Sequence, residues 1–505
     1  MIDFRKWLFI MLLFHLLGTT LTAWGQSKGG GSRIQIKQAD KGKYRSGGER
    51  INRLIGNVIF EHEGALLYCD SAWLYADRNL LEAFENVHVI QHDTIHLYSK
   101  YLKYDGNTKL GEAVGNVRLQ DPEMTLTTDR LDFDRNTNTS IYRTGGLIVN
   151  DENTLKSQIG IYYTALKRFV FQKDVELQNK RYTIFSDTLL YSTQSRISTF
   201  RGPTRILSDS SSIYCENGLY NTQTDIAQFN QNAEIWDQHR RLRGDSLYYN
   251  KPAGFGQAFG HVELLDTVER SIITGARGEY LEFPEGAAVG GEPLYTLYDD
   301  QDSLHIHGDS IYYASDSSGN GLLKIFHRVR FFRSDMQGVC DSLTYSTTDS
   351  TFRMFHHPAL WSGKSQMTGD TILLEMRKQE MDSLKIIGNA FVLSIDTLDQ
   401  YNQVRGKRMN GKFVDGELRK MFSIGNGQTV YYAQEEDGDY IGVNRSDCSN
   451  IKMLFRNKQL DRVTFLVKPV SNLYPLDRVP PEELKLKGFE NRFGERPESK
   501  AAVFD

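Results

Sequence analysis

The chain has 505 residues and a formal net charge of −4 at pH 7. This balance gives no basic surface for a nucleic-acid backbone, so nucleic acid is excluded as a partner class. The 26 Tyr, 27 Phe and 43 Gly against 11 Pro favour a β-rich fold, because aromatic residues prefer strands and glycine serves turns.

The N-terminal segment of residues 1–25 has the form of a cleavable export signal. Arg5 and Lys6 precede an apolar run over Trp7–Leu17, and small residues around Ala23 offer a cleavage site. The run is short for a membrane-spanning helix, so a retained anchor is the less favoured interpretation. We expect an exported, periplasmic protein, with association at the outer membrane left open. Residues 26–50, which include Gly29–Gly31, are expected to be a flexible linker.

One short pattern recurs from residue 51 to residue 427. A small residue, here called the anchor, stands directly before a position that is polar in eleven of the twelve repeats. The intervals are 29 residues from Ser99 to Gly244, and 29 to 37 residues beyond it. A period of this size is the signature of a repeat architecture. The anchors are Cys69, Ser99, Thr128, Ser157, Ser186, Cys215, Gly244, Gly275, Gly308, Cys340, Gly369 and Gly406.

Each repeat also carries two stretches in which apolar residues alternate with polar ones. An apolar residue stands two before the anchor in eleven repeats, and an aromatic residue stands five after it from Tyr104 to Tyr345. A second alternation lies upstream, often opened by Gly-Asn as in Gly56-Asn57-Val58. Such alternation predicts strands, and short turns between them favour antiparallel pairing. We expect an elongated, all-β, antiparallel fold of about twelve repeats with two strands each.

The end of the chain departs from the repeat. Residues 428–470 include Val463-Thr464-Phe465-Leu466-Val467 and are expected to add closing strands, because repeat proteins need a modified terminal unit. Residues 471–505 are expected to be a flexible, Pro-containing tail.

The repeated Asp–Ser/Thr pair has a catalytic and a structural interpretation. The apolar residue two before the anchor and the aromatic residue five after it are an odd number apart, so a flat strand would place them on opposite faces. Both point inward only if the chain bulges or turns a corner at the pair, where a short polar side chain can bind freed backbone groups. A catalytic site is not needed a dozen times, so we expect structural corners at Asp70, Asp129, Asp187, Asp245, Asp309, Asp341 and Asp370.

The cysteines do not suggest a disulfide framework. Cys69, Cys215 and Cys340 are anchors that lie four or five repeats apart, and Cys448 stands outside the repeat. A disulfide needs Cα atoms within about 7 Å, which distant repeats in a linear stack do not offer. We expect small buried sites at the three anchors and no disulfide.

His305 and His307 are the residues that come nearest to a metal motif. They would share one face of a strand, but no carboxylate or cysteine stands at ligand spacing to complete a tetrahedral set. We expect a solvated strand face there and no metal site.

The Gly-Asn-Val openings, the small residue before a mid-strand Asp and the period near thirty residues resemble the OstA/LptA family. The name OstA stands for organic solvent tolerance, and the family includes the periplasmic bridge of lipopolysaccharide transport. The resemblance covers about Ile51 to Gly427. The tail over Pro480–Phe489 is similar to the end of OstA-like proteins of the Bacteroidetes type.

The resemblance implies a β-jellyroll, a double sheet folded over into a V with an apolar groove along its length. Lipid A acyl chains would lie in that groove, and other lipopolysaccharide-transport components would dock through exposed sheet edges. It implies no catalytic residue, no enzymatic activity and no cofactor. The repeat places one aliphatic and one aromatic residue per repeat in the groove, at Leu102, Tyr104, Leu131, Phe133, Leu189, Tyr191, Leu247, Tyr249, Ile311, Tyr313, Leu343 and Tyr345.

The aromatic column has a second interpretation, as a stack that holds neighbouring repeats together. Burial of a ring is strongly favourable in either case, so the two roles are compatible.

Three functions from different classes remain open at this point. The favoured one is a periplasmic bridge that carries lipid A-type lipids toward the outer membrane. A parallel β-helix acting on polysaccharide, as enzyme or adhesin, would also suit repeats of this length, but it requires parallel strands. An outer-membrane barrel would need lipid-facing side chains, whereas outward positions such as Arg118 and Lys173 are charged.

The repeat number makes a prediction about shape in solution. With strands about 4.8 Å apart, twelve repeats of two strands would extend over roughly 115 Å. Small-angle scattering of the mature chain should give the profile of an elongated particle, and a compact, spherical profile would contradict the linear repeat.

Overall fold

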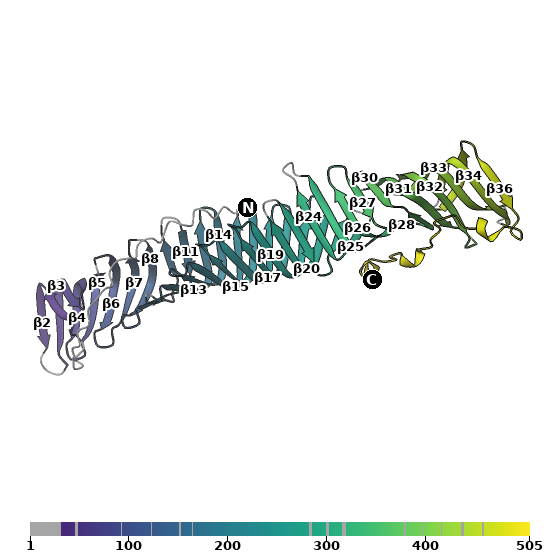
Figure 1. Cartoon of the computed structure of the whole chain (residues 1–505). Coiled ribbons are helices and arrows are strands. Elements are labelled where there is room, and N and C mark those ends of the chain that lie inside the picture. Colours follow the sequence, from purple (N-terminus) through teal and green to yellow (C-terminus); the bar gives the residue numbers. More distant parts are fainter. Residues whose placement is uncertain are drawn as a thin grey trace, which may run out of the picture. The chain divides into compact units, whose positions relative to one another are not determined.

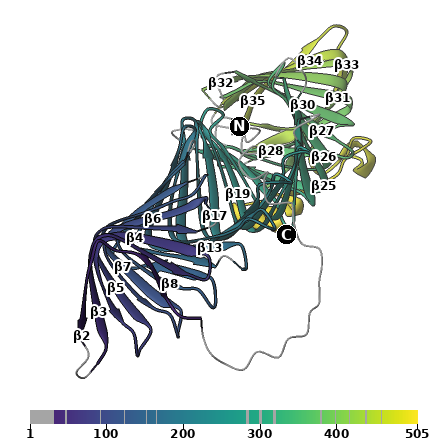
Figure 2. The same ribbon diagram turned by 90° about the vertical axis from the view of Figure 1, so that its left-hand side faces the viewer.

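The computed structural model describes residues 32–505 with short gaps at 46–48, 92, 123, 151–152, 164, 282–284, 299–301, 316–319, 378–379, 397, 416, 436–438 and 457–458. The expected export signal lies outside the described residues. Figures 1 and 2 show a chain of successive strands. The chain forms two compact units. Of the described residues, unit 1 contains those of 32–238 and Ser246–Ala253, and unit 2 those of His239–Asp245 and 254–505.

Unit 1 is built of strands. They are β1 (Gln35–Gln38), β2 (Lys41–Arg45), β3 (Ile51–His62), β4 (Ala65–Tyr75), β5 (Leu80–Gln91), β6 (Ile95–Asp105), β7 (Leu110–Gln120), β8 (Thr125–Asp134), β9 (Thr139–Tyr142), β10 (Gly146–Val149), β11 (Asn153–Ser157), β12 (Ile159–Tyr163), β13 (Arg168–Asn179), β14 (Tyr182–Ser192), β15 (Ile197–Ser208), β16 (Ser211–Asn221) and β17 (Ile226–Asp237). The next strand, β18 (Arg240–Asn250), has residues in both units.

Unit 2 continues the pattern and ends in three short 3-10 helices. Its strands are β19 (Phe255–Asp266), β20 (Ser271–Leu281), β21 (Gly286–Gly290), β22 (Leu294–Tyr298), β23 (Ser303–His307), β24 (Ser310–Ser315), β25 (Gly321–Arg333), β26 (Met336–Ser346), β27 (Thr351–Phe355), β28 (Ala359–Ser362), β29 (Ser365–Thr368), β30 (Thr371–Arg377), β31 (Glu380–Ile395), β32 (Tyr401–Val414), β33 (Glu417–Gln434), β34 (Tyr440–Arg456), β35 (Gln459–Leu466) and β36 (Val470–Tyr474). The helices are η2 (Pro481–Glu483), η3 (Phe493–Glu495) and η4 (Ala501–Phe504).

The pairing of these strands confirms the all-β antiparallel fold. Successive strands pair in order, as β3 with β4 and β4 with β5 in unit 1, and β31 with β32 and β32 with β33 in unit 2. Each register recorded for the described strands is antiparallel. The parallel β-helix alternative is therefore wrong for this part of the chain.

Two segments expected to be flexible carry structure. Inside the expected linker, β1 and β2 pair with β3, because their backbone groups complete the free edge of that strand. The expected tail begins with β36 on β34, and further along it Leu486 and Val503 are buried. These short segments contain few apolar residues, so their sequences did not predict strands. They form strands because their backbone groups pair with a neighbouring strand of the sheet.

Strand β4 shows how the predicted break in alternation is built. Leu67 and Cys69 are buried before the Asp, Ala72 and Leu74 are buried after it, and all four are at most 7% exposed. The inward positions therefore change parity between residues 69 and 72, as the sequence predicted. The pairing of β3 with β4 is interrupted at the same place, between Ile55 and Val58.

The partner strand forms the corner with two residues of left-handed conformation. Gly56 and Asn57 face Asp70, with φ of +82° and +46°. Equivalent pairs face other Asp residues, for example Gly388-Asn389 opposite Asp370. Glycine and asparagine tolerate this conformation better than other residues, which explains the recurrent Gly-Asn.

The corner Asp residues are bound mostly through side chains. Asn86 Nδ2 donates to Asp70 at 2.8 Å, Arg328 to Asp309 at 2.8 Å, and Asn389 to Asp370 at 3.1 Å. The Ser or Thr after the Asp donates to its carboxylate in two repeats, Thr188 to Asp187 and Ser342 to Asp341. In the remaining two, Asp245 lies beside His261, and Asp129 faces Gly115-Asn116.

The corner at Asp245 and Gly260 offers a double-mutant test. Gly260 has φ +67°, and an added Cβ would overlap the Asp245 carboxylate. We expect Gly260→Ala to lower the free energy of unfolding by about 2–3 kcal/mol, from the left-handed backbone and the overlap together. In an Asp245→Ala background the cost should fall to about 1–2 kcal/mol. Denaturant unfolding of the four proteins measures this, and additive effects would contradict a direct contact.

The anchor cysteines are sealed inside the fold. Cys69, Cys215 and Cys340 are at most 6% exposed, and together with the buried Cys448 they carry free thiols. Burial raises the pKa of the Cys69, Cys215 and Cys340 thiols to about 12.

These shifts predict a loss of stability at alkaline pH. An unfolded thiol ionises near pH 8.5, so between about pH 8.5 and 12 the unfolded chain releases a proton that the folded chain keeps. Each thiol should then lower the free energy of unfolding by up to about 1.4 kcal/mol per pH unit. Unfolding at pH 8, 9 and 10 should be less pH-dependent in the triple Cys69→Ser, Cys215→Ser, Cys340→Ser variant than in the wild type. Parallel profiles would show that the thiols do not titrate in this way.

Candidate functional site

The inner face of each unit carries the residues predicted to line a groove. In unit 1, Leu102, Tyr104 and Leu131 belong to one apolar core, with Phe133 packed against it. In unit 2, Ile311 and Leu343 belong to another core, against which Tyr313 and Tyr345 pack. The same two positions of the repeat therefore point inward in both units.

The aliphatic and aromatic members of this set differ in exposure. The six aliphatic residues are 1–4% exposed, so they have little surface for a ligand; they are Leu102, Leu131, Leu189, Leu247, Ile311 and Leu343. Tyr104 is also buried, at 7%, whereas the other five rings are half-buried; these are Phe133, Tyr191, Tyr249, Tyr313 and Tyr345. The accessible part of the predicted set is thus its aromatic column.

Several rings of this column also have a packing role. Phe133 covers its cross-strand partner Gly111, and Tyr313 covers Gly321, so that a Cβ at either glycine would overlap the ring. Tyr345 stacks on Phe352 with ring centroids 4.3 Å apart. A ring that lies over a glycine fills the space a side chain would take, which links neighbouring strands.

A polar cluster lies beside the inner face in unit 1. The hydroxyl of Tyr104 is 3.0 Å from His62 Nδ1 and 3.2 Å from the Arg135 guanidinium. Arg135 also donates to the carbonyls of His62 and Glu63, more than 70 residues away. Burial raises the pKa of Tyr104, and the hydrogen bond from Arg135 opposes that rise. The cluster ties the end of β3 to the end of β6 and the turn after β8, a contact that the repeat pattern did not predict.

The core of unit 2 is rich in methionine. Met354, Met367, Met409, Met421 and Met453 are fully buried, with 0% exposure, in one continuous cluster. Methionine is unbranched and adapts to irregular space, so it fills this core without strict shape matching. The sequence offered no signal for this role beyond the inward parity of each position.

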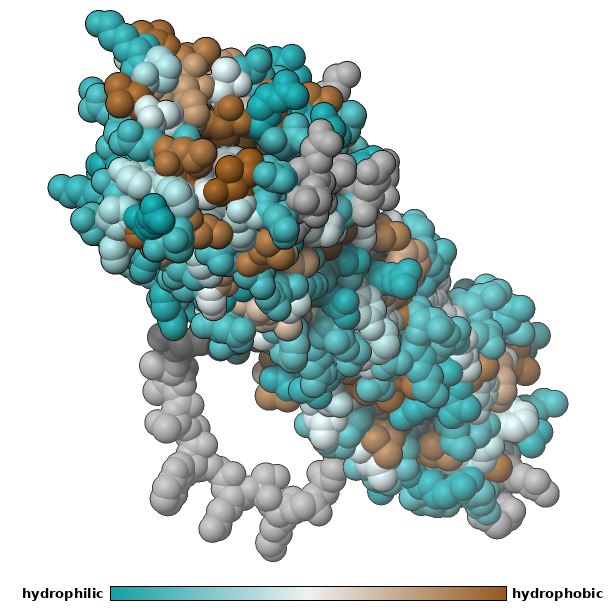
Figure 3. Space-filling model, turned by 90° about the vertical axis from the view of Figure 1, so that its right-hand side faces the viewer, coloured by the Kyte–Doolittle hydropathy of each residue, from teal (hydrophilic) through white to brown (hydrophobic). Residues whose placement is uncertain are grey.

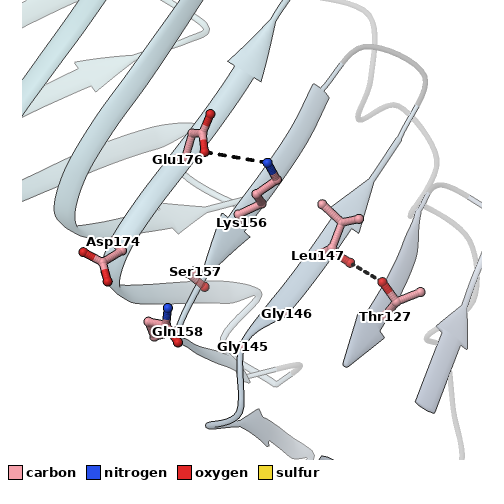
Figure 4. A pocket seen from close by; sticks show the side chains of 9 residues that line it. All are labelled: Thr127, Gly145, Gly146, Leu147, Lys156, Ser157, Gln158, Asp174 and Glu176. Carbon is pink, nitrogen blue, oxygen red and sulfur yellow. Dashed lines mark hydrogen bonds and ion pairs between the residues drawn. The ribbon is translucent and has the colours of Figure 1, made fainter. Parts of the chain in front are cut away.

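Unit 1 also has a shallow hollow lined mainly by polar residues (Figure 4). Lys156 lies 3.8 Å from Glu176, and Thr127 donates to the Leu147 carbonyl at 3.4 Å. Ser157 is bound to the Tyr142 hydroxyl at 2.7 Å. Ser157 Oγ also donates to the Ile159 carbonyl at 3.0 Å, so its recorded partners are a phenol and a carbonyl and not a base that would activate it as a nucleophile.

The two histidines of unit 2 are held by different partners. His305 Nδ1 lies 3.0 Å from Thr296 Oγ1, and desolvation lowers the pKa of His305. His307 is 9% exposed, binds the Pro293 carbonyl at 2.8 Å and packs on Phe504. The expected solvated face is therefore wrong for His307, because the C-terminal segment covers it. Among the described residues no group of three His, Cys, Asp or Glu side chains could hold a metal ion.

The last strands of unit 2 expose apolar side chains. Ile441, Val467, Val470 and Leu473 are 48–66% exposed. Figure 3 shows apolar side chains among polar ones on the end of unit 2 that faces the viewer. In the described part of the chain, no helix has the length and apolar character needed to cross a membrane.

Comparisons with known proteins place part of the chain in a family. Residues 31–187 match the family model described as OstA-like protein. One solved structure that matches is LptH of Pseudomonas aeruginosa, the LptA-homologous periplasmic component of a lipopolysaccharide transport device. It is 13% identical, with a TM-score of 0.15, over 27% of this chain and 81% of that one.

A second solved structure is the extracellular domain of a one-component system of B. thetaiotaomicron. It is 8% identical, with a TM-score of 0.09, over 85% of this chain and 97% of that one. No curated protein matches the sequence. Over residues 31–187, the family match confirms the resemblance to the OstA/LptA family that the repeats indicated.

Proposed function

We propose that this protein is a periplasmic bridge that binds lipopolysaccharide and carries lipid A-type lipids toward the outer membrane on its inner face. The observation that carries the proposal is the inward apolar column, which repeats with the same two positions in both units. The OstA-like match over residues 31–187 supports a role of the lipopolysaccharide-transport type.

The exposure of the inner residues suggests how a lipid would be held. The half-buried rings, such as Tyr191 and Tyr249, would contact the acyl chains, and the buried aliphatic residues would form the floor beneath them. Each buried CH₂ group contributes about 0.8 kcal/mol, so several acyl chains bind well without a specific hydrogen bond. The same lack of specificity would let the lipid move from one repeat to the next.

A binding role also fits the corner residues better than an enzymatic one. An Asp stands at the corner in seven of the twelve repeats, and the bonds recorded for these residues are local and structural. The proposed transfer needs neither a cofactor nor a metal, because the lipid is moved and not chemically changed.

The partners we propose are lipopolysaccharide itself and further components of its transport at either membrane. The last strand of unit 2, β36, carries the exposed apolar side chains of Val470 and Leu473, which would suit docking through a sheet edge. An edge strand offers unpaired backbone groups to another strand.

Site-specific photo-crosslinking tests the lipid face. A crosslinking amino acid at Tyr191 or Tyr249 should capture lipopolysaccharide in cells that make it, because these rings are the accessible inner residues. The same amino acid at Arg118 or Lys173, two exposed outer positions, should not. Capture would be detected as a shifted band that reacts with an antibody to the lipid. Equal capture at both sets, or capture at neither, would contradict the assignment of the inner face.

A further inference from the structure

The outer face of unit 2 carries a row of residues that crosses the sheet perpendicular to the strands. Cross-strand partners follow one another in the registers of β26, β28, β29, β31, β32, β33 and β34. Glutamines alternate with apolar residues along it. In order, the row is Gln337, Trp361, Gln366, Leu393, Gln403, Val430 and Arg445.

The C-terminal segment of residues 480–505, here called the strap, lies along this row. In Figure 1 it is the yellow segment that runs from the last strands back toward β25 and β28. At one end Glu483 is paired with Arg445 at 3.1 Å. At the other end Phe504 packs on His307, and the Ala502 carbonyl accepts from Arg330 at 3.1 Å.

Two glutamines bind the backbone of the strap in the same way. Gln403 donates to the Leu484 carbonyl and accepts from the Leu486 N–H, both at 2.8 Å. Gln366 donates to the Glu490 carbonyl and accepts from the Arg492 N–H, again both at 2.8 Å. Each amide thus imitates one pair of a β-ladder, and the two contacts lie six residues apart on the strap.

The third glutamine binds a strap side chain. Gln337 accepts from Arg496 Nε at 2.8 Å, and Arg496 also donates to the Gly363 carbonyl at 2.8 Å. Gln337, Gln366 and Gln403 are only 1–3% exposed, so they are buried for these contacts. Burying an amide without a hydrogen bond costs free energy, and the strap supplies the hydrogen-bond partners that these three amides need.

Between the glutamines, apolar side chains of the strap cover apolar residues of the sheet. Leu486 is buried in a cluster with Phe391, Leu393, Val430 and Val443. Phe493 packs against a second cluster, whose members are Val339, Ala359 and Trp361. Trp361 is 0% exposed, although it lies on the outer face.

The glutamines occur only where the strap lies. All three stand three residues before their anchors Cys340, Gly369 and Gly406. The nine earlier repeats have other residues at that position, namely Leu66, His96, Thr125, Thr154, Thr183, Ser212, Arg241, Ile272 and His305. This position therefore holds various residues in the nine earlier repeats, and it holds glutamine in the three repeats that contact the strap.

The strap is also separate from the inner core. Leu484, Leu486, Phe489 and Phe493 of the strap join the two outer clusters, whereas the buried members of the inner core run from Ile273 to Phe455. The link over residues 475–478 is exposed. The inner core can therefore stay packed if the strap leaves the sheet.

From these contacts we propose that the outer face of unit 2 is a peptide-binding site, and that the strap is its resident and detachable ligand. The site takes a chain segment that turns between its contacts, binds the backbone of that segment through Gln366 and Gln403, and accepts apolar side chains at the positions of Leu486 and Phe493. The inference does not depend on the proposed lipid function, since it concerns the opposite face of the sheet.

The test uses the full chain with a protease recognition sequence inserted between Leu476 and Asp477. After folding, the chain is cut there, and size-exclusion chromatography shows whether the strap co-elutes. A fluorescent synthetic peptide of residues 479–505 is then added, and its binding is followed by anisotropy. We expect the cut strap to stay bound and to exchange with the peptide, and the uncut chain to bind the peptide at least about tenfold more weakly, because its site is occupied in cis.

Variants of the added peptide distinguish backbone recognition from non-specific apolar binding, and they leave the fold of the chain unchanged. N-methylation at Leu486 and Arg492 removes the two N–H donors and should weaken binding about tenfold or more. Leu486→Ala and Phe493→Ala peptides should weaken it similarly. N-methylation at the exposed Lys487 is the matched control and should leave affinity within about twofold.

A chain variant checks the sheet side of the site. Gln366→Leu with Gln403→Leu should release the cut strap, whereas Gln428→Leu, on the same outer face of β33, should retain it. Circular dichroism verifies that each variant is folded. The proposal is overturned if the cut strap cannot be exchanged below the unfolding transition, since it is then a fixed part of the fold. It is equally overturned if the strap leaves and the labelled peptide does not bind.

Discussion

The whole architecture depends on one backbone constraint at the corners, where two left-handed residues of one strand lie opposite a single residue of the next, which is Asp in seven of the twelve repeats. The extra residue changes which side chains point inward, so that one strand contributes an apolar face on both sides of the bend. Without it, the residues before and after the anchor would point to opposite faces. The small anchors follow from the same crowding, because a Cβ at Gly308 or Gly369 would overlap the isoleucine opposite it.

The sequence predicted this much because the corner is a local feature with a fixed period. Alternation, the odd spacing across Asp70 or Asp245, and the turns between strands all lie within one repeat. The residues that form the corner opposite each Asp were harder to predict, because Gly388-Asn389 and Asp370 lie on different strands and face each other only after these strands pair. The burial of the groove aliphatics depends on the facing half of the sheet, which no single repeat specifies.

The structure of the strap could not be predicted from its own sequence. Its residues have no strand period and include several prolines and charges, which is the composition of a flexible end. The signal that was present lies elsewhere, in three glutamines at a position where other repeats have unrelated residues. A buried amide has to be satisfied, and here the partner is a segment more than 80 residues away. The contact between these glutamines and the strap can be recognised only from the folded structure.

The methionines that fill the core of unit 2 would become oxidised if the unit opened and exposed them. Thioethers such as those of Met409 and Met421 are readily converted to sulfoxides by peroxide, but only when an oxidant reaches them. At 0% exposure they are shielded while the unit is closed. Each sulfoxide would add a polar group to an apolar interior and so oppose its repacking. A brief opening in an oxidising compartment would therefore leave a lasting mark, unless a reductase removed it.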